Sequence, residues 1–232
     1  MCATAISSRA TPAPGRREAI SLLGASALAG LPGSTTAAPA PLAISFAPPA
    51  SSGPPAGFSV GLTGGGSPPV WSVIPEPSVP GGHVLAQTSM DKSDYRFPLA
   101  IYDNLSAANL DVSVRFKAIA GRIDRAAGIA IRMIDAQNYY VVRANALEDN
   151  VNFYRVINGS RHEIAGGSAK VSSDTWHTLR LKAEGDSFAI GLNGRTLFSA
   201  RDKTFSKAGK IALWTKADSV TWFDALTIQP LP

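Results

Sequence analysis

The sequence YYVVRANALEDNVNFYRVING, which covers residues 139–159, decides how this chain folds. β-Branched and aromatic residues dominate Tyr139–Asn145 and Asn152–Ile157, as is typical of β-strands. The intervening residues 147–150, Leu-Glu-Asp-Asn, are turn formers, and Asn158-Gly159 is the strongest short signal for a β-hairpin. The stretch therefore predicts two strands joined by an acidic turn and followed at once by a hairpin turn.

Short β-type runs separated by turn residues recur along most of the chain. They are Trp71–Ile74, Val84–Gln87, Phe97–Ile101, Leu110–Ala118, Ala127–Ile134, Tyr139–Asn145, Asn152–Ile157, Trp176–Ala183, Ser187–Leu192, Thr196–Ala200, Lys210–Thr215 and Val220–Ile228. Asn193-Gly194 indicates a second type I′ hairpin turn, and no segment after the first 38 residues keeps a helical period. Short strands at spacings of roughly 8–12 residues predict an all-β, antiparallel sandwich or barrel.

Residues 1–38 have the organisation of an export signal. The pair Arg16-Arg17 precedes a weakly apolar run, Ile20–Leu31, and then small residues, in the order of a signal's n-, h- and c-regions. Paired arginines before a softened apolar run are typical of twin-arginine signals. The run is shorter than the ~20 residues needed to span a bilayer. We therefore expect export to the periplasm or the exterior, with no membrane span in the mature chain.

Composition sets the remaining limits. Residues 39–57 are rich in Pro, Ala and Ser, which predicts an extended linker and a sandwich domain over 58–232. The leader holds three arginines and one glutamate, so its removal lowers the formal net charge from +5 to about +3. The remaining basic residues form no stripe, which argues against nucleic acid as a partner. The only cysteine, Cys2, lies in the leader, and the three histidines lack metal-ligand spacing.

Side-chain alternation assigns residues to faces of the predicted strands. A core face is predicted by three apolar residues of one parity, Ile129, Ile131 and Met133, and Arg132 would then project from the other face. Arg143 and Asn145 lie two residues apart and should share one face of the next strand. Asp224 falls among apolar residues of the last strand, where a carboxylate needs a partner.

Three segments carry a family resemblance: RAAGIAIRMIDAQNYYVVRANALEDNVNFYRVING, DTWHTLRLKAEGDSFAIGLNGRTLF and KAGKIALWTKADSVTWFDALTI. In this order they resemble the concanavalin A-like lectin/glucanase superfamily, and within it the bacterial exported domains grouped with the 3-keto-disaccharide hydrolases. The resemblance covers about Trp71 to Ile228. It implies a jelly-roll sandwich of two curved antiparallel sheets, of which the concave one presents a groove. This architecture hosts lectins, hydrolases and adhesive modules, so the resemblance alone does not fix the function.

The candidate substrate-binding residues combine planar hydrogen-bonding groups with aromatic faces. Sugar hydroxyls need such donors and acceptors, and the C–H face of a sugar ring packs on an aromatic ring. The candidates are Arg132, Arg143, Asn145, Tyr154, Trp214 and Lys216. The alternative is that they are ordinary strand residues that face solvent and pair with acidic neighbours.

Glu148 is the candidate catalytic residue. Glycoside hydrolysis usually needs two carboxyl groups across the scissile bond, and the Glu-x-Asp-x-Glu motif of laminarinase-type members is absent here. Glu148 and Asp149 are adjacent in a turn and point in different directions, so a solvated turn is the alternative interpretation.

Asp224 is the candidate metal ligand. Its position resembles that of a structural calcium held between terminal strands in many jelly-roll domains, and no other cofactor is expected. The alternative is a carboxylate bonded to the amides of a neighbouring loop.

The sequence thus predicts an exported β-sandwich that recognises a carbohydrate ligand on its concave sheet. Two alternatives stay open, a glycoside hydrolase acting on 3-keto-disaccharides and a structural or adhesive module that binds a protein. The missing carboxylate pair favours binding over hydrolysis.

Overall fold

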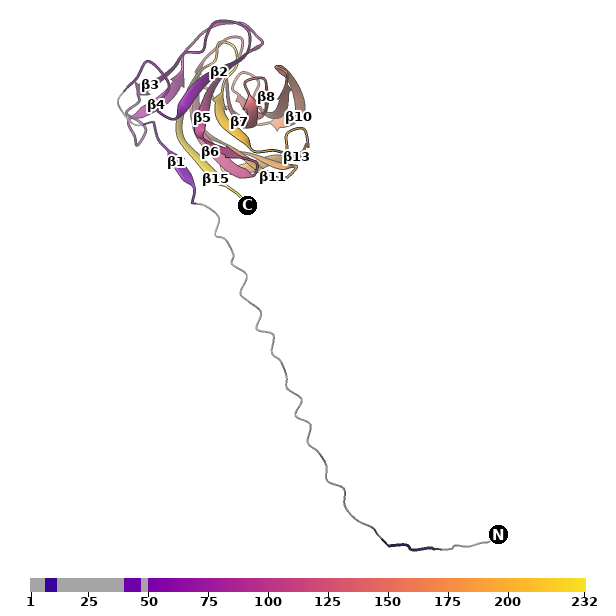
Figure 1. Ribbon diagram of the computed structural model, residues 1–232. Helices are drawn as coiled ribbons and strands as arrows, with labels where there is room; N and C mark the ends of the chain where they lie inside the picture. Colours follow the sequence, from indigo (N-terminus) through magenta and orange to yellow (C-terminus); the bar gives the residue numbers. More distant parts are fainter. Residues whose placement is uncertain (1–6, 12–39, 47–49) are drawn as a thin grey trace. The chain divides into compact units, whose positions relative to one another are not determined.

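β-Strands form all the regular structure that the computed structural model describes, which comprises residues 7–11, 40–46 and 50–232. The strands build two antiparallel sheets that pack face to face (Figure 1). The predicted all-β sandwich is therefore confirmed. No helix in these described ranges is long and apolar enough to span a membrane. The predicted export signal falls on residues 1–38, nearly all of which lie outside the described residues.

Sheet A has eight strands and sheet B has seven. Along sheet A the order is β13 (Arg195–Arg201), β12 (Ser187–Leu192), β11 (Trp176–Glu184), β6 (Leu110–Ala120), β15 (Val220–Pro230), β4 (His83–Gln87) and β3 (Trp71–Pro75), with β1 (Leu42–Ile44) also paired to β15. Along sheet B the order is β10 (Ser160–Ser168), β9 (Asn150–Ile157), β8 (Asn138–Asn145), β7 (Ala126–Asp135), β14 (Gly209–Trp214), β5 (Arg96–Ala107) and β2 (Phe58–Gly64).

Period-two alternation places the main core between the sheets. On β6 the residues Val112, Val114 and Phe116 are fully buried, while the residues between them are half-buried on the opposite face. The core of sheet B includes Tyr140 and Val142 of β8. On these strands, every second side chain points into the core between the sheets, and the side chains between them point to the outer face of their sheet.

The segment predicted to be a linker contributes to the sandwich. Leu42–Ile44 pairs with Leu226–Ile228 of β15, and Phe46 is only 1% exposed in the main core. The ring of Phe46 contacts that of Phe58, with centroids 5.9 Å apart. The Pro- and Ala-rich composition hid this strand because Phe46 is the only buried residue among residues 40–46.

Both predicted Asn-Gly turns have the backbone conformation of type I′ hairpins. Asn158 and Gly159 connect β9 to β10 with φ of 47° and 80°, and Asn193 and Gly194 connect β12 to β13 with φ of 51° and 80°. Positive φ at both central residues matches the right-handed twist of the strands, which explains the preference for Asn followed by Gly.

Sheet B curls around the face that it turns away from the core. In the strand order, β10 lies five strands away from β5, which would separate them by roughly 24 Å in a flat sheet. Nevertheless the guanidinium of Arg161 on β10 lies 5.3 Å from the ring centroid of Phe97 on β5. The backbone N–H of Arg161 also donates to the hydroxyl of Tyr95 at 3.0 Å. The outer face of sheet B is therefore concave.

A second apolar cluster fills part of this concave face. It consists of Phe97, Leu99, Ala126, Ala130, Met133, Tyr139, Val141, Tyr154, Val156, Ala212 and Trp214. At its centre the hydroxyl of Tyr139 accepts a hydrogen bond from Nε1 of Trp214 at 3.2 Å and lies 2.7 Å from Oγ1 of Thr63 on β2. Burial raises the pKa of Tyr139 to about 12, so the hydroxyl stays protonated in this bond network.

The type I′ turn between β12 and β13 gives a first testable prediction. A Cβ at Gly194 would meet no atom within 4 Å, so only its positive φ resists substitution. We expect Gly194→Val to lower the free energy of unfolding by about 1–2 kcal/mol. Gly65→Val is the matched control, because Gly65 also has open space but an ordinary φ. Equal denaturation midpoints for the two variants would contradict the strain argument.

Candidate functional site

Polar side chains gather at one end of the concave face of sheet B. On β8, Tyr139 and Val141 face the concave side, and the same parity brings Arg143 and Asn145 there. Arg143 pairs with Asn152 of β9 across the sheet, and Asn145 pairs with Asn150. The predicted shared face of Arg143 and Asn145 thus lies on the concave surface, beyond the apolar cluster.

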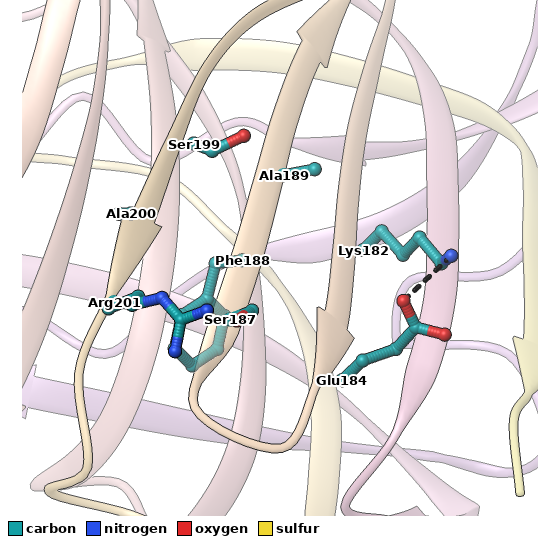
Figure 2. A pocket seen from close by; sticks show the side chains of 8 residues that line it. All are labelled: Lys182, Glu184, Ser187, Phe188, Ala189, Ser199, Ala200 and Arg201. Atoms are coloured by element: carbon teal, nitrogen blue, oxygen red, sulfur yellow. Dashed lines mark ion pairs between the residues drawn. The ribbon is translucent and has the colours of Figure 1, made fainter.

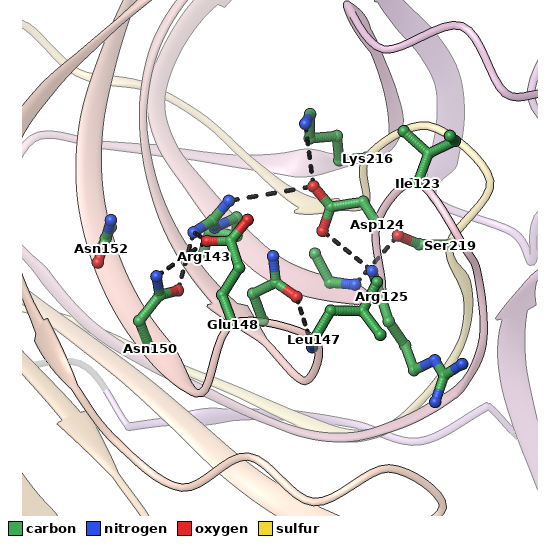
Figure 3. A network of polar contacts seen from close by, with 12 residues as sticks. Ile123, Asp124, Arg125, Arg143, Leu147, Glu148, Asn150, Asn152, Lys216 and Ser219 are labelled. Carbon is green, nitrogen blue, oxygen red and sulfur yellow. Dashed lines mark hydrogen bonds and ion pairs between the residues drawn. The ribbon is translucent and has the colours of Figure 1, made fainter.

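Arg143 is the centre of this group. Its Nη2 donates to Oε2 of Glu148 at 2.7 Å and to Oδ1 of Asn150 at 2.8 Å, and Nδ2 of Asn150 also donates to Glu148 (Figure 3). Its Nη1 lies 4.0 Å from Oδ2 of Asp124. The guanidinium also lies 5.6 Å from the ring centroid of Tyr154. Only 3% of the Arg143 side chain is exposed.

A second cation completes the group from the loop that follows β14. Nζ of Lys216 lies 3.0 Å from Oδ2 of Asp124 and 2.6 Å from Oδ1 of Asp94. Figure 3 shows Lys216 and Arg143 approaching Asp124 from two sides. We call the set Asp94, Asp124, Arg143, Asn145, Glu148, Asn150 and Lys216 the Arg143 network. Its members come from four separate segments of the chain.

A buried carboxylate holds the loop that carries Asp124. Asp218 accepts hydrogen bonds from the backbone N–H groups of Arg122, Ile123 and Asp124 at 2.8–3.0 Å. Gly121 begins this loop with φ of 141°, and a Cβ there would lie 1.8 Å from the carbonyl oxygen of Asp124. Glycine is therefore required at this close approach of two backbone segments.

The network contains polar atoms that have no protein partner. Nε of Arg143 and Nδ2 of Asn145 are buried donors that make no hydrogen bond. Oδ2 of Asp124 is buried as well, but it is ion-paired with Nζ of Lys216 at 3.0 Å. The two donors are two of nine unbonded buried atoms in the described part of the chain, and both lie on the concave face of β8. Two unpaired donors on one face can bind an acceptor such as the oxygen of a hydroxyl.

Burial and charge set the protonation states of the network. Burial raises the pKa of Asp124, and the nearby charges of Lys216 and Arg143 only partly oppose it. Burial also acts to raise the pKa of Glu148, but hydrogen bonds from Asn150 and Arg143 outweigh it and lower that pKa. Burial acts to lower the pKa of Lys216, but Asp94 and Asp124 outweigh it and raise that pKa. Glu148 and Lys216 are therefore held in their charged forms.

The structure brings five of the six predicted substrate-binding residues to the concave face. Arg143, Asn145 and Lys216 belong to the network, and Tyr154 lies beside it. Trp214 lies deeper, fully buried, and packs on Phe97 at 5.1 Å between ring centroids. A Cβ at Gly128 would touch this indole at 3.0 Å, so the glycine makes room for it beside Arg143.

Arg132 does not join the others, which corrects the predicted grouping. A bulge between Ile131 and Asp135 interrupts the alternation, and Arg132 adopts φ of 48°. Its three guanidinium nitrogens donate to the carbonyls of Ala108, Phe205 and Gly185 at 2.7–2.8 Å. The guanidinium lies 5.2 Å from the ring centroid of Phe188, in the core between the sheets.

Asp224, the expected calcium ligand, is ion-paired. Its Oδ2 lies 2.9 Å from Nη1 of Arg115 on the neighbouring strand β6, so a cationic side chain supplies the partner that a buried carboxylate needs. The described residues include no group of three or more His, Cys, Asp or Glu side chains suited to a metal ion.

Sequence reasoning missed Asp94, Asp124 and Arg161. Asp94 and Asp124 lie in loops outside residues 139–159. Arg161 follows the hairpin turn and packs 4.4 Å from the ring centroid of Tyr154. Asn150, expected to lie near Arg143 in the patch around the turn, begins β9 and bonds Arg143. The approach of the missed residues depends on which strands are neighbours in sheet B, and that strand order was not predicted.

A hollow of about 450 Å³ lies elsewhere, over β11–β13 of sheet A (Figure 2). Its charged side chains are already paired, Lys182 with Glu184 at 2.8 Å and Arg201 with Asp186 at 3.1 Å. None of its lining residues carries a buried polar atom without a partner. The hollow lacks the unpaired buried groups that a specific ligand would satisfy. We therefore place the candidate site at the network.

A family model described as "Galactocerebrosidase, C-terminal lectin domain" matches residues 100–231. A levanase of Bacillus subtilis (strain 168) is 34% identical over 73 residues, which are 32% of this chain and 11% of the levanase. The chain thus aligns with only a small part of that enzyme.

Solved structures show the same fold. The carbohydrate-binding module CBM66 from Bacillus subtilis superposes with a TM-score of 0.58 at 23% identity, covering 73% of this chain and 94% of the module. A Bacillus subtilis protein of unknown function with a galectin-like fold gives a TM-score of 0.51 at 9% identity, covering 73% and 88%. These likenesses support the predicted concanavalin A-like architecture.

The contrast between Arg132 and the network gives a second prediction. We expect Arg132→Met to lower the free energy of unfolding by at least about 2 kcal/mol, because three carbonyls lose their donor. Glycan binding per folded molecule should be unchanged, since Arg132 lies in the core side of the sheet. Arg195→Met, at an exposed arginine, is the control, and chemical denaturation is the measurement. A stable Arg132→Met protein that has lost glycan binding would return Arg132 to the site.

Proposed function

The chain belongs to the family of galactocerebrosidase C-terminal lectin domains, and from this premise we propose that it binds a carbohydrate at the Arg143 network. The observation that carries the proposal is the presence of two unpaired buried donors, Nε of Arg143 and Nδ2 of Asn145, on one face of β8. Vicinal hydroxyls of a sugar would bond these atoms, and a guanidinium fork suits such a pair of oxygens. The ring of Tyr154, which is 5% exposed, lies next to the guanidinium of Arg143 and would line this side of the site.

Glycoside hydrolysis stays an alternative. Glu148 is ionised and held by Arg143 and Asn150, so it could serve as a base but not as a proton donor. Burial raises the pKa of Asp124, but its side chain is 1% exposed and paired with Lys216, so it is poorly placed to protonate a leaving group. The states of Glu148 and Asp124 therefore support binding better than catalysis. The experiment described next distinguishes glycan binding from glycan hydrolysis.

The proposal predicts that Arg143→Lys weakens glycan binding by roughly tenfold or more, because lysine keeps the charge but loses the planar fork and Nε. The ligand panel includes levan, β-glucan and galactan, with calorimetry for affinity and reducing-sugar release for hydrolysis. Arg180→Lys is the matched control, since Arg180 pairs with Asp111 on sheet A, away from the network. Full binding by Arg143→Lys, or loss of binding by Arg180→Lys, would place the site elsewhere. Sugar release by the wild type that Glu148→Gln abolishes would support the hydrolase alternative.

We also propose that the chain is exported through a twin-arginine route, which the paired Arg16-Arg17 and the short apolar run support. Replacing both arginines by lysine should leave the precursor in the cytoplasm of the producing cell, as measured by fractionation. Arg9→Lys, outside the pair, is the control and should not change export. Normal export of the double variant would remove the twin-arginine route while leaving export itself in place.

A further inference from the structure

The charges of the Arg143 network are arranged by depth. Its two cations are buried, with 3% of the Arg143 side chain and 12% of the Lys216 side chain exposed. Two of its carboxylates form the solvent-facing rim, where Glu148 is 48% and Asp94 70% exposed. A ligand that approaches from solvent therefore meets carboxylates before it meets cations.

The cations are also fully matched by carboxylates. Glu148 pairs with Arg143, Asp94 pairs with Lys216, and Asp124 lies between both cations. The network thus places two ionised rim carboxylates and the buried Asp124 against two cations. Among its neighbours, Arg161 over Tyr154 lies near exposed Glu163, which accepts a hydrogen bond from Asn152, and Arg125 donates to Ser173 and to the carbonyl of Gly121.

From this arrangement we infer that the site is specific for uncharged glycans and rejects those that carry carboxylates, such as uronic acids. Exposed carboxylates accept hydrogen bonds from sugar hydroxyls, and they repel an anion brought next to them. A uronate would have to displace Glu148 or Asp94 to reach a cation, which leaves a carboxylate without its partner. The inference rests on the proposed function, because it names the class of sugar that the same site takes.

The test compares each polysaccharide with its own oxidised form. Levan, galactan and β-glucan are used before and after oxidation of their primary alcohols to carboxylates, which changes charge with little change in shape. We expect the wild type to bind the neutral form of its ligand at least roughly tenfold more tightly than the oxidised form. High salt should narrow this ratio, since screening weakens repulsion between exposed charges.

Glu148→Gln tests the cause of the discrimination. Removing one rim carboxylate should raise the affinity for the oxidised form relative to the neutral form, whatever happens to the affinity for each. Glu184→Gln is the matched control, because Glu184 is an exposed carboxylate that pairs with Lys182 on sheet A, and its ratio should equal that of the wild type.

The outcomes separate this inference from the proposed function. Equal or tighter binding of the oxidised form by the wild type overturns the inference and leaves carbohydrate binding in place. The inference is also overturned if neither Glu148→Gln nor salt changes the ratio of the affinity for the neutral form to that for the oxidised form. The rejection of the oxidised form would then be steric. Binding of no polysaccharide by the wild type would remove the proposed function, and the inference with it.

Discussion

The contact between Arg161 and Phe97 across the concave face is the constraint on which this structure depends. These residues sit on strands five places apart in sheet B, so their contact requires the whole sheet to bend. Thr63 closes the same end by bonding Tyr139, four strands away in the order. The bend encloses a second apolar cluster, and its burial stabilises the curvature, because flattening the sheet would expose Trp214, Tyr139 and their neighbours to water.

This curvature decides where a ligand can bind. Aromatic side chains occupy one end of the concave face, so a groove running along the whole sheet is already filled there. At the other end the loops after β4, β6, β8 and β14 converge and supply Asp94, Asp124, Glu148 and Lys216. Gly128 links the two ends, since its missing side chain lets the Trp214 indole lie next to Arg143. The apolar cluster thus packs against the guanidinium of Arg143 through the ring of Tyr154, and Nη2 of Arg143 contacts the polar residues Glu148 and Asn150.

Alternation along a strand predicted the parts of this site that obey it. Arg143 and Asn145 share a face, and both Asn-Gly turns have the positive φ that their sequence requires. The prediction failed for Arg132 because a bulge reverses the direction of its side chain. Gly209 allows this bulge, since a Cβ there would lie 2.4 Å from the backbone of Arg132. Asp94 and Asp124 could not be assigned, since their positions follow from the strand order of sheet B and from the packing of the loops before β5 and β7. Phe46 escaped notice because one buried ring hardly changes the composition of its segment.

The two buried arginines show how structural and ligand-binding roles differ. All three guanidinium nitrogens of Arg132 donate to backbone carbonyls, so each nitrogen of this cation is used by the fold. Arg143 is equally buried, but its Nε has no acceptor and its Nη1 reaches Asp124 only at 4.0 Å. A buried polar network that is only partly satisfied is unfavourable by itself, because each unpaired group has lost its hydration. Such a network is consistent with a site whose remaining hydrogen bonds form when a sugar hydroxyl oxygen accepts from Arg143 and Asn145.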